Sequence, residues 1–451
     1  PGGLPAGAQG AWSATNEPAW SGAYRLDGGL EQNYAAAYTA NLAESALPPL
    51  PFAQNLLAPG RETAREYAGT GGGAEDSSGF MFGANANPYG WTSPGGSFDE
   101  GWRPAAAAQL MHAVWEYCAF TGDLATLRND VYPMMKELAG FWQAFLSESE
   151  EGALYVTPGA APDGGAVVLA TVNDRVAVKQ FLRDVIDAAA LLGIDSAQRA
   201  QWQALHDKMP GEATLDSGLI GEWYGEAGGE DPEAASTPAA RLERLAGLYP
   251  GNSIGQDNEE LLAAARATLD AGGGDAAELT RRAAMWARTL DGERAYSLLR
   301  AQTTYLHTNL LCGAPYALEY STGFTAAANE MLLQSQHGYI QPLPALALTW
   351  ANGSVSGLMA RGGFEVDMKW SDQYLDEMAI LSTAGGECAV RYDNLAGGFT
   401  LTGPGGAVRY TTDADGTVRF DTVQGARYVL TPTGDKPIGT PTGVEAVVNG
   451  K

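Results

Sequence analysis

Apolar residues recur at helical spacing through residues 105–330. One stripe contains Met111, Val114 and Cys118, and another follows Pro133, a residue that favours the first turn of a helix. Because positions three and four residues apart share one helix face, these stripes predict a series of amphipathic helices. Successive helices with no strand between them indicate a helical bundle or toroid.

The pattern changes over residues 329–370, where helical spacing ends at a Pro-Leu-Pro turn and period-two alternation begins. Short alternating runs separated by turn residues continue from there to about residue 430. We therefore expect a helical domain over 1–338 and a small β domain over 339–432. The Pro/Gly/Thr-rich segment 433–451 is expected to be a linker or tail.

Charge and cysteine content exclude several classes of function. The chain of 451 residues carries 53 acidic and 27 basic side chains, for a net charge of −26. Such a field repels phosphate backbones and anionic membranes, so we expect no nucleic-acid partner. Three distant cysteines show neither metal-ligand spacing nor a disulfide framework, and no apolar run has transmembrane length, so no metal site and no membrane insertion are expected.

Several segments carry a specific resemblance. They are QGAWSATNEPAWSGAY at 9–24, NYAAAYTANLAE at 33–44, GLYPGN at 247–252, DGERAYSLLR at 291–300 and the run 329–370. In this order they resemble glycoside hydrolase family 95, the inverting α-L-fucosidases and α-L-galactosidases. The resemblance implies an (α/α)6 toroid or barrel followed by a C-terminal β-sandwich domain. It also implies a glycan ligand, no cofactor, and a secreted or cell-surface location.

The family's large N-terminal β domain has no counterpart in the resemblance, which covers most of residues 9–371. Either a separate chain or domain carries it as a partner, or this protein never had it.

An inverting glycosidase needs a protonated carboxyl to donate to the leaving oxygen and a second carboxylate to activate water. The resemblance places the acid on Asp163 and the water-orienting pair on Asp27 and Gly29. The base falls at residues 320–321, beside Glu319 as the nearby carboxylate, while Asp174 keeps a site position. Asp163 and Asp27 also stand before glycines, as turn residues do, so a structural role explains them equally.

The remaining candidate residues are aromatic or basic. Arg241 and Arg244 stand where the family has histidines, and we expect them to pair with acidic groups and close the cleft. Aromatic faces suit sugar rings but also pack the ends of helical barrels. The aromatic candidates are Trp20, Tyr24, Trp91, Trp102 and Trp223.

Two functions fit these observations. The first is a catalytically degenerate family member, a pseudoenzyme with a carbohydrate-binding or scaffold role at the cell surface. The second is an active exo-glycosidase acting on α-L-fucosyl or α-L-galactosyl linkages. It would use Asp163 as acid, Glu319 or Asp27 as base, and Asp174 as support.

Overall fold

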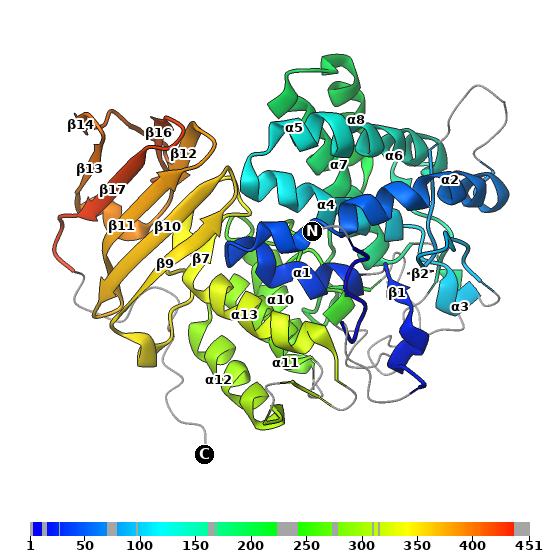
Figure 1. Ribbon diagram of the computed structural model, residues 1–451, viewed down its shortest axis with the longest axis horizontal. Coiled ribbons are helices and arrows are strands. Elements are labelled where there is room, and N and C mark those ends of the chain that lie inside the picture. The colour runs from blue at the N-terminus through cyan, green and yellow to red at the C-terminus, as the bar shows by residue number, and fades with distance from the viewer. Residues whose placement is uncertain are drawn as a thin grey trace.

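A computed structural model gives the fold for most of the chain. It describes residues 3–10, 16–26, 28–69, 79–95, 98–160, 167–168, 170–222, 242–272, 278–308, 311–313 and 316–436. Helices dominate up to residue 332 and strands dominate beyond it, so the chain forms a helical domain followed by a strand domain (Figure 1). In these ranges no helix combines the length and the apolar character that crossing a bilayer requires.

The predicted series of helices is present. The longer helices are α1 (Gly29–Thr39), α2 (Pro49–Tyr67), α4 (Ala106–Thr121), α6 (Tyr132–Phe145), α7 (Val172–Leu192), α8 (Ser196–Lys208), α10 (Glu259–Ala271), α11 (Leu279–Arg288), α12 (Gly292–Gln302) and α13 (Leu318–Leu332). Short helices α3 (Phe98–Gly101) and α5 (Leu124–Thr126) lie between them.

Helix α7 shows how the sequence sets these elements. Thr171 caps its start by accepting a hydrogen bond from the backbone N–H of Asp174, and Gly193 ends it in the left-handed conformation at φ 68°. Phe181 and Val185 in its apolar stripe are fully buried. The sequence therefore specifies where α7 begins, where it ends and which face packs in the core.

Helices from the two ends of the domain meet. Helix α1 contacts α4 on one side and α13 on the other, while α4 contacts α7 and α13 contacts α11. The side chain of Asn329 donates to Thr39 Oγ1 at 2.8 Å, and the hydroxyl of Thr322 donates to the carbonyl of Gln32 at 3.2 Å. Helices α2, α8 and α12 pack against α4, α7 and α11 respectively. The contacts thus arrange α1, α4, α7, α11 and α13 around the middle of the domain.

The strand domain contains two antiparallel sheets. Six strands pair in the order β14-β13-β17-β11-β10-β9 and three in the order β12-β16-β15. The strands are β9 (Gly353–Ala360), β10 (Phe364–Ser371), β11 (Tyr374–Ser382), β12 (Gly386–Val390), β13 (Phe399–Gly403), β14 (Gly406–Ala407), β15 (Thr411–Thr412), β16 (Val418–Thr422) and β17 (Arg427–Pro432).

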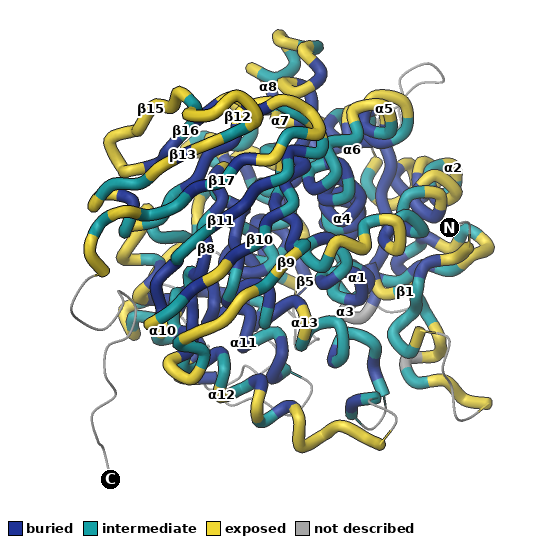
Figure 2. Tube along the Cα trace, turned by 60° about the vertical axis from the view of Figure 1, so that its left-hand side comes forward, coloured by how far each residue is buried: buried dark blue, intermediate teal, exposed yellow. Residues whose placement is uncertain are grey.

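Alternation along these strands builds one apolar core. In β10, Phe364, Val366, Met368 and Trp370 are buried, while the residues between them are half-buried or exposed. The period-two pattern predicted there is confirmed, and Figure 2 shows the neighbouring strand β11 as largely buried.

Outside these two sheets, the described residues also include eight two-residue strands that pair within loops. They are β1 (Tyr24–Arg25) with β2 (Asn85–Ala86), β3 (Ser147–Glu148) with β4 (Leu154–Tyr155), β5 (Gly159–Ala160) with β6 (Val167–Val168), and β7 (Leu333–Gln334) with β8 (Gln341–Pro342).

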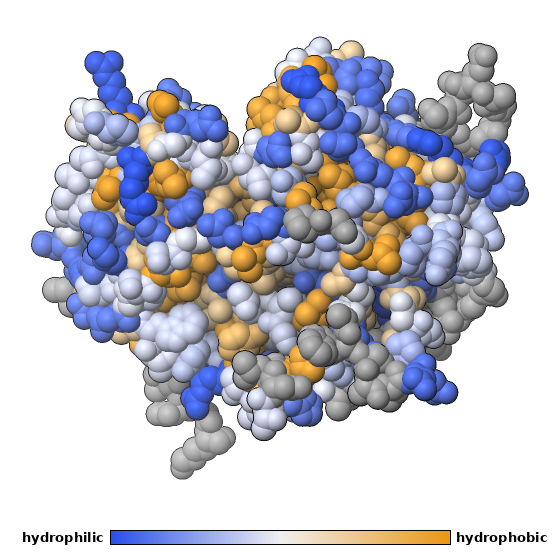
Figure 3. All heavy atoms as spheres, viewed as in Figure 1, coloured by the Kyte–Doolittle hydropathy of each residue, from blue (hydrophilic) through white to orange (hydrophobic). Residues whose placement is uncertain are grey.

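The turn between β9 and β10 joins the domains. The backbone N–H of Gly362 donates to the carbonyl of Ala119 at 2.7 Å, at the end of α4. Away from this contact a notch separates the two domains at one edge, and mostly hydrophilic residues cover the face that Figure 3 shows. The junction therefore places the β9–β10 turn beside the inner helices.

Candidate active site

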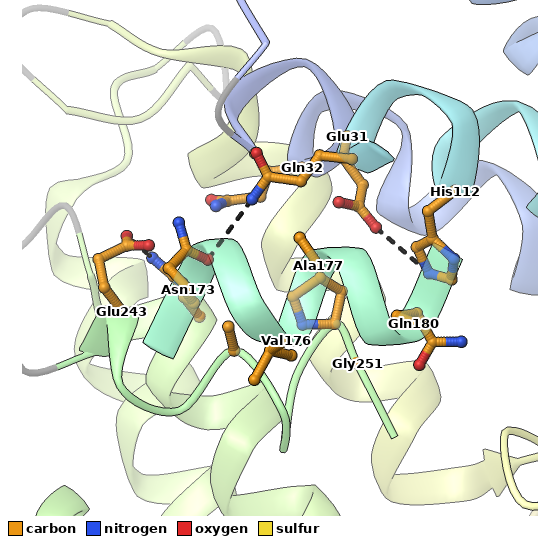
Figure 4. Close-up of a pocket in the computed structure, with 14 residues that line it drawn as sticks. Glu31, Gln32, His112, Asn173, Val176, Ala177, Gln180, Glu243 and Gly251 are labelled. Carbon is orange, nitrogen blue, oxygen red and sulfur yellow. Dashed lines mark hydrogen bonds and ion pairs between the residues drawn. The ribbon is translucent and has the colours of Figure 1, made fainter. Parts of the chain in front are cut away.

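A cavity lies between α1, α4, α7, α11 and the loop around residues 243–251 (Figure 4). Most of its polar lining is amide or charged. These residues are Glu31, Gln32, Gln109, His112, Asn173, Gln180, Glu243 and Arg281. Elements far apart in the sequence thus bring hydrogen-bonding side chains to the centre of the helical domain.

Glu31 stands in the first turn of α1 and points toward His112 (Figure 4). Gly28 precedes the helix at φ 102°, a conformation that favours glycine, and directs the chain into the helix there. Burial raises the pKa of the Glu31 carboxyl to about 7, an effect that the nearby His112 opposes. A large share of the molecules therefore carry a proton on this carboxyl at neutral pH.

His112 on α4 is held by α7. Its Nδ1 lies 2.7 Å from Oδ2 of Asp184, whose other oxygen accepts from the Gln180 amide at 2.8 Å, and its Nε2 lies 3.7 Å from Glu31. Burial alone would lower the pKa of His112, but Asp184 foremost, followed by Glu31, raises it to about 10. The imidazole is therefore a cation at neutral pH, next to the protonatable carboxyl.

A second compartment adjoins this cavity and shares Glu31 and His112 with it. Its other walls contain two ion pairs, Arg288 with Glu330 and Arg361 with Glu116, and the aromatic rings of Tyr38 and Tyr249. Arg288 donates to Glu330 Oε1 at 2.8 Å, and both side chains are at least nine-tenths buried. The central cavity is thus lined by Arg–carboxylate pairs.

Two more Arg–carboxylate pairs lie near the cavity of Figure 4. One lines this cavity, and the other lies next to it in the loop around residues 243–251. Arg281 Nη1 lies 2.8 Å from Glu243, and both residues line the cavity. Burial alone would lower the pKa of the Arg281 guanidinium, but Glu243 and, more weakly, Glu319 raise it. Arg244, one residue after Glu243, pairs with Glu222 at 2.8 Å, and both are buried.

The structure describes two of the four carboxylates expected to be catalytic. Asp163 and Asp27 lie outside the described residues. Glu319 occupies the first turn of α13, within electrostatic reach of Arg281. Asp174 is buried, accepts from the Thr171 hydroxyl at 2.7 Å, and belongs to the cap of α7.

Among the expected aromatic and basic residues, those that the structure describes lie apart from one another. Trp223 and Arg241 lie outside the described residues, as does the side chain of Trp20. Tyr24 packs on Phe52 with ring centroids 4.9 Å apart, and Trp91 is half exposed.

Trp102 is buried and lies along a separate surface groove. It stacks on Phe98, and its indole N–H donates to the carbonyl of Pro158 at 2.7 Å. The described residues that line the central cavity do not include Trp102, Tyr24 or Trp91.

The sequence did not point to several residues that the structure brings to the cavity, among them Glu31, His112, Glu116 and Arg361. A usable signal was present for His112, because Gln109, His112 and Glu116 recur at spacings of three and four along α4. These positions form a polar stripe beside the apolar one, which indicates a helix face that meets a polar interior.

Comparison with protein families defines the class of this molecule. Residues 1–332 match the glycosyl hydrolase family 95 catalytic domain, and residues 334–430 match the glycoside hydrolase family 95 C-terminal domain. The chain therefore belongs to glycoside hydrolase family 95, as the resemblance of its segments predicted.

Curated relatives are named as fucosidases. Alpha-L-fucosidase 2 of Arabidopsis thaliana is 30% identical over 414 residues, covering 85% of this chain and 47% of that protein. Probable alpha-fucosidase A of Aspergillus niger is 27% identical over 434 residues, covering 89% and 54%. The chain thus spans about half the length of these relatives.

A solved structure supports the fold. A putative kojibiose phosphorylase from the human microbiome aligns with a TM-score of 0.57 at 13% identity, over 86% of this chain and 60% of that one. At this identity the likeness concerns the fold alone.

Proposed function

We propose that this chain binds a sugar unit of a glycan in the central cavity without hydrolysing it, as a carbohydrate-binding module at the cell surface. Its helical domain is an (α/α)6 barrel and its strand domain a β-sandwich. The alternation of inner helices with outer ones, and the two sheets, support this architecture. Because its relatives are about twice as long, a separate chain or domain carrying an N-terminal β domain is a proposed partner.

The pairing of carboxylates with arginines around the cavity carries this proposal. An inverting glycosidase needs an ionised carboxylate that takes a proton from water. Glu243, Glu330 and Glu116 are each held by an arginine instead. Burial alone would raise the pKa of Glu116, but Arg361 lowers it below its usual value, so this carboxylate is a weaker base than an ordinary one.

The remaining lining suits hydroxyl groups. Gln32, Gln109, Asn173 and Gln180 line the cavity, and each side-chain amide carries both donor and acceptor groups. One N–H of Gln180 is used on Asp184, and one of Gln109 on Asn173. A protonated Glu31 adds one more donor of the same kind. Such convergent polar groups can orient a sugar ring by its hydroxyls.

One observation favours an active enzyme as a second candidate. The pKa of Glu31 is about 7, which is the property that a general acid needs near neutral pH. In that case Glu31 would protonate the leaving oxygen of an α-L-fucosyl or α-L-galactosyl linkage. Glu319, close to Arg281, would be the base.

Binding and turnover measurements on the purified chain separate the two candidates. We expect saturable calorimetric binding of L-fucose or L-galactose, reduced tenfold or more (about 1.4 kcal/mol) by Glu31→Ala. We expect no turnover of α-L-fucosyl or α-L-galactosyl substrates above background. Glu148→Gln, which changes an exposed carboxylate paired with Lys208, serves as the control and should bind normally.

Other outcomes overturn the binding proposal. Turnover that Glu31→Gln and Glu319→Gln both abolish would establish the enzymatic candidate. Absence of both binding and turnover with either sugar would reject both candidates.

A further inference from the structure

The strand domain reaches the central cavity through one side chain. Arg361 stands in the turn between β9 and β10, and its guanidinium lines the compartment that also holds Glu31 and His112. Its Nε donates to Glu116 Oε1 at 3.0 Å, and its Nη2 contacts the other carboxylate oxygen. Among the described lining residues it alone comes from beyond residue 332.

The turn that carries Arg361 is fixed against α4. Gly362 donates its N–H to the Ala119 carbonyl at 2.7 Å, and the guanidinium lies 4.5 Å from the centre of the Phe120 ring. Ser335 Oγ accepts from both the backbone N–H and Nη1 of Arg361, at 3.1 and 3.2 Å. These contacts orient the guanidinium toward the carboxylate of Glu116.

Glu116 in turn faces the ionisable centre of the cavity. The charged and titratable groups around it come from α4 itself and from four further helices, and include Glu31 of α1, His112 of α4, Asp184 of α7, Arg288 of α11, Glu330 of α13 and the hydroxyl of Tyr38 on α1. Glu116 follows His112 by four residues on the same helix, so both lie on one face. Of the opposing groups, Arg361 lowers the pKa of Glu116 most.

We propose that Arg361 is a positioning residue of the cavity, holding Glu116 ionised and in one orientation toward His112 and Glu31, so that the strand domain completes the binding site. This inference rests on the proposed function only in taking the cavity as the place where the sugar binds. A guanidinium suits the task because its planar fork binds both carboxylate oxygens at once, which fixes direction as well as charge.

The first test measures affinity for L-fucose by calorimetry. Arg361→Met and Glu116→Gln should each weaken binding about tenfold, and the double variant should be no weaker than either single one because the two residues act as a unit. Arg361→Lys should restore part of the affinity, since an ammonium keeps the charge and loses the fork. Arg427→Met is the matched control, because Arg427 pairs with Asp367 at the surface of the same sheet.

The second test needs no sugar. The side-chain carboxyl carbons of glutamate are labelled with 13C, and the Glu116 signal, assigned by its loss in Glu116→Gln, is followed by NMR from pH 3 to 9. In Arg361→Met this signal should titrate at a clearly higher pH than in the wild type, because a buried carboxylate has lost its main counter-charge. Arg361→Lys should lie between them, and Arg427→Met should match the wild type.

The two tests fail in different ways. If the wild type binds neither L-fucose nor L-galactose, the proposed function loses its support, and the titration alone then decides the role of Arg361. An unchanged Glu116 titration in Arg361→Met would overturn the inference. If the wild type binds L-fucose and Arg361→Met binds it with the same affinity, the inference is also overturned, since Arg361 would then only hold the two domains together.

Discussion

The centre of the helical domain and the interior of the strand domain are built in opposite ways. In the strand domain the core is apolar, and ion pairs such as Arg427–Asp367 and Lys369–Glu377 lie on partly exposed side chains. In the helical domain Arg288–Glu330 and His112–Asp184 are buried. Because desolvating charges is costly, buried pairs are a poor way to gain stability. The difference indicates that the helical centre keeps its charges for a site.

The first prediction concerns pH and His112. Its folded-state pKa of about 10 exceeds the unfolded value of about 6.5, so its stabilising contribution is complete below pH 6.5 and lost as pH rises through 10. Each pKa unit between the folded and unfolded values corresponds to about 1.4 kcal/mol, so the unfolding free energy lost is on the order of 5 kcal/mol at most.

Urea unfolding of the wild type and His112→Gln between pH 6 and 10 measures this effect. The stability difference between them should shrink as pH rises. Parallel curves would show that His112 is not charged in the folded chain. Glu31 acts in the same direction at lower pH, since its pKa is raised to about 7, and its contribution is lost as pH rises through that value.

The second prediction removes one member of a buried pair. Arg288→Met should lower the free energy of unfolding by about 3–5 kcal/mol, because Glu330 is left as an uncompensated buried charge. Urea unfolding at pH 7 measures it. The double variant Arg288→Met, Glu330→Met should recover much of the loss, whereas Arg427→Met at the surface should cost about 1 kcal/mol or less.

A double variant as unstable as Arg288→Met would contradict this account. It would mean that the guanidinium stabilises by packing, on Tyr249 for example, whose ring centre lies 5.4 Å away.

The third prediction tests the apolar half of the comparison. Leu430→Ala removes a fully buried side chain from β17 and should cost about 3 kcal/mol of unfolding free energy through lost transfer energy and a residual cavity. Sugar binding by the folded protein should stay as in the wild type. Altered affinity in folded Leu430→Ala would show that the strand core, and not Arg361 alone, shapes the cavity.

The sequence was sufficient for most of the fold because local patterns encode it. Alternation in 364–370 predicted β10, and the stripe of Met111, Val114 and Cys118 predicted α4. The family resemblance, carried by segments along the helical part, is confirmed.

The site was harder because its chemistry arises between distant residues. His112 acquires its charge from Asp184, 72 residues away, and Glu116 is held by Arg361, 245 residues away. No periodicity along α4 specifies either partner. For Glu31, the resemblance pointed to two nearby positions, Asp27 and Gly29, and the raised pKa of Glu31 comes from burial in the folded chain, which the local sequence does not encode.

The contact between α1 and α13 has a consequence for how the protein is made. Thr39 and Asn329, which hydrogen-bond across this contact, are 290 residues apart in the chain. At about 5–20 residues per second, the ribosome takes roughly 15–60 s to synthesise that interval. During this time α1 presents Leu30, Tyr34 and Tyr38, all buried in the finished fold, without its later neighbour. The helical domain therefore closes only after nearly all of it has been translated, and until then α1 exposes apolar side chains that a chaperone could bind.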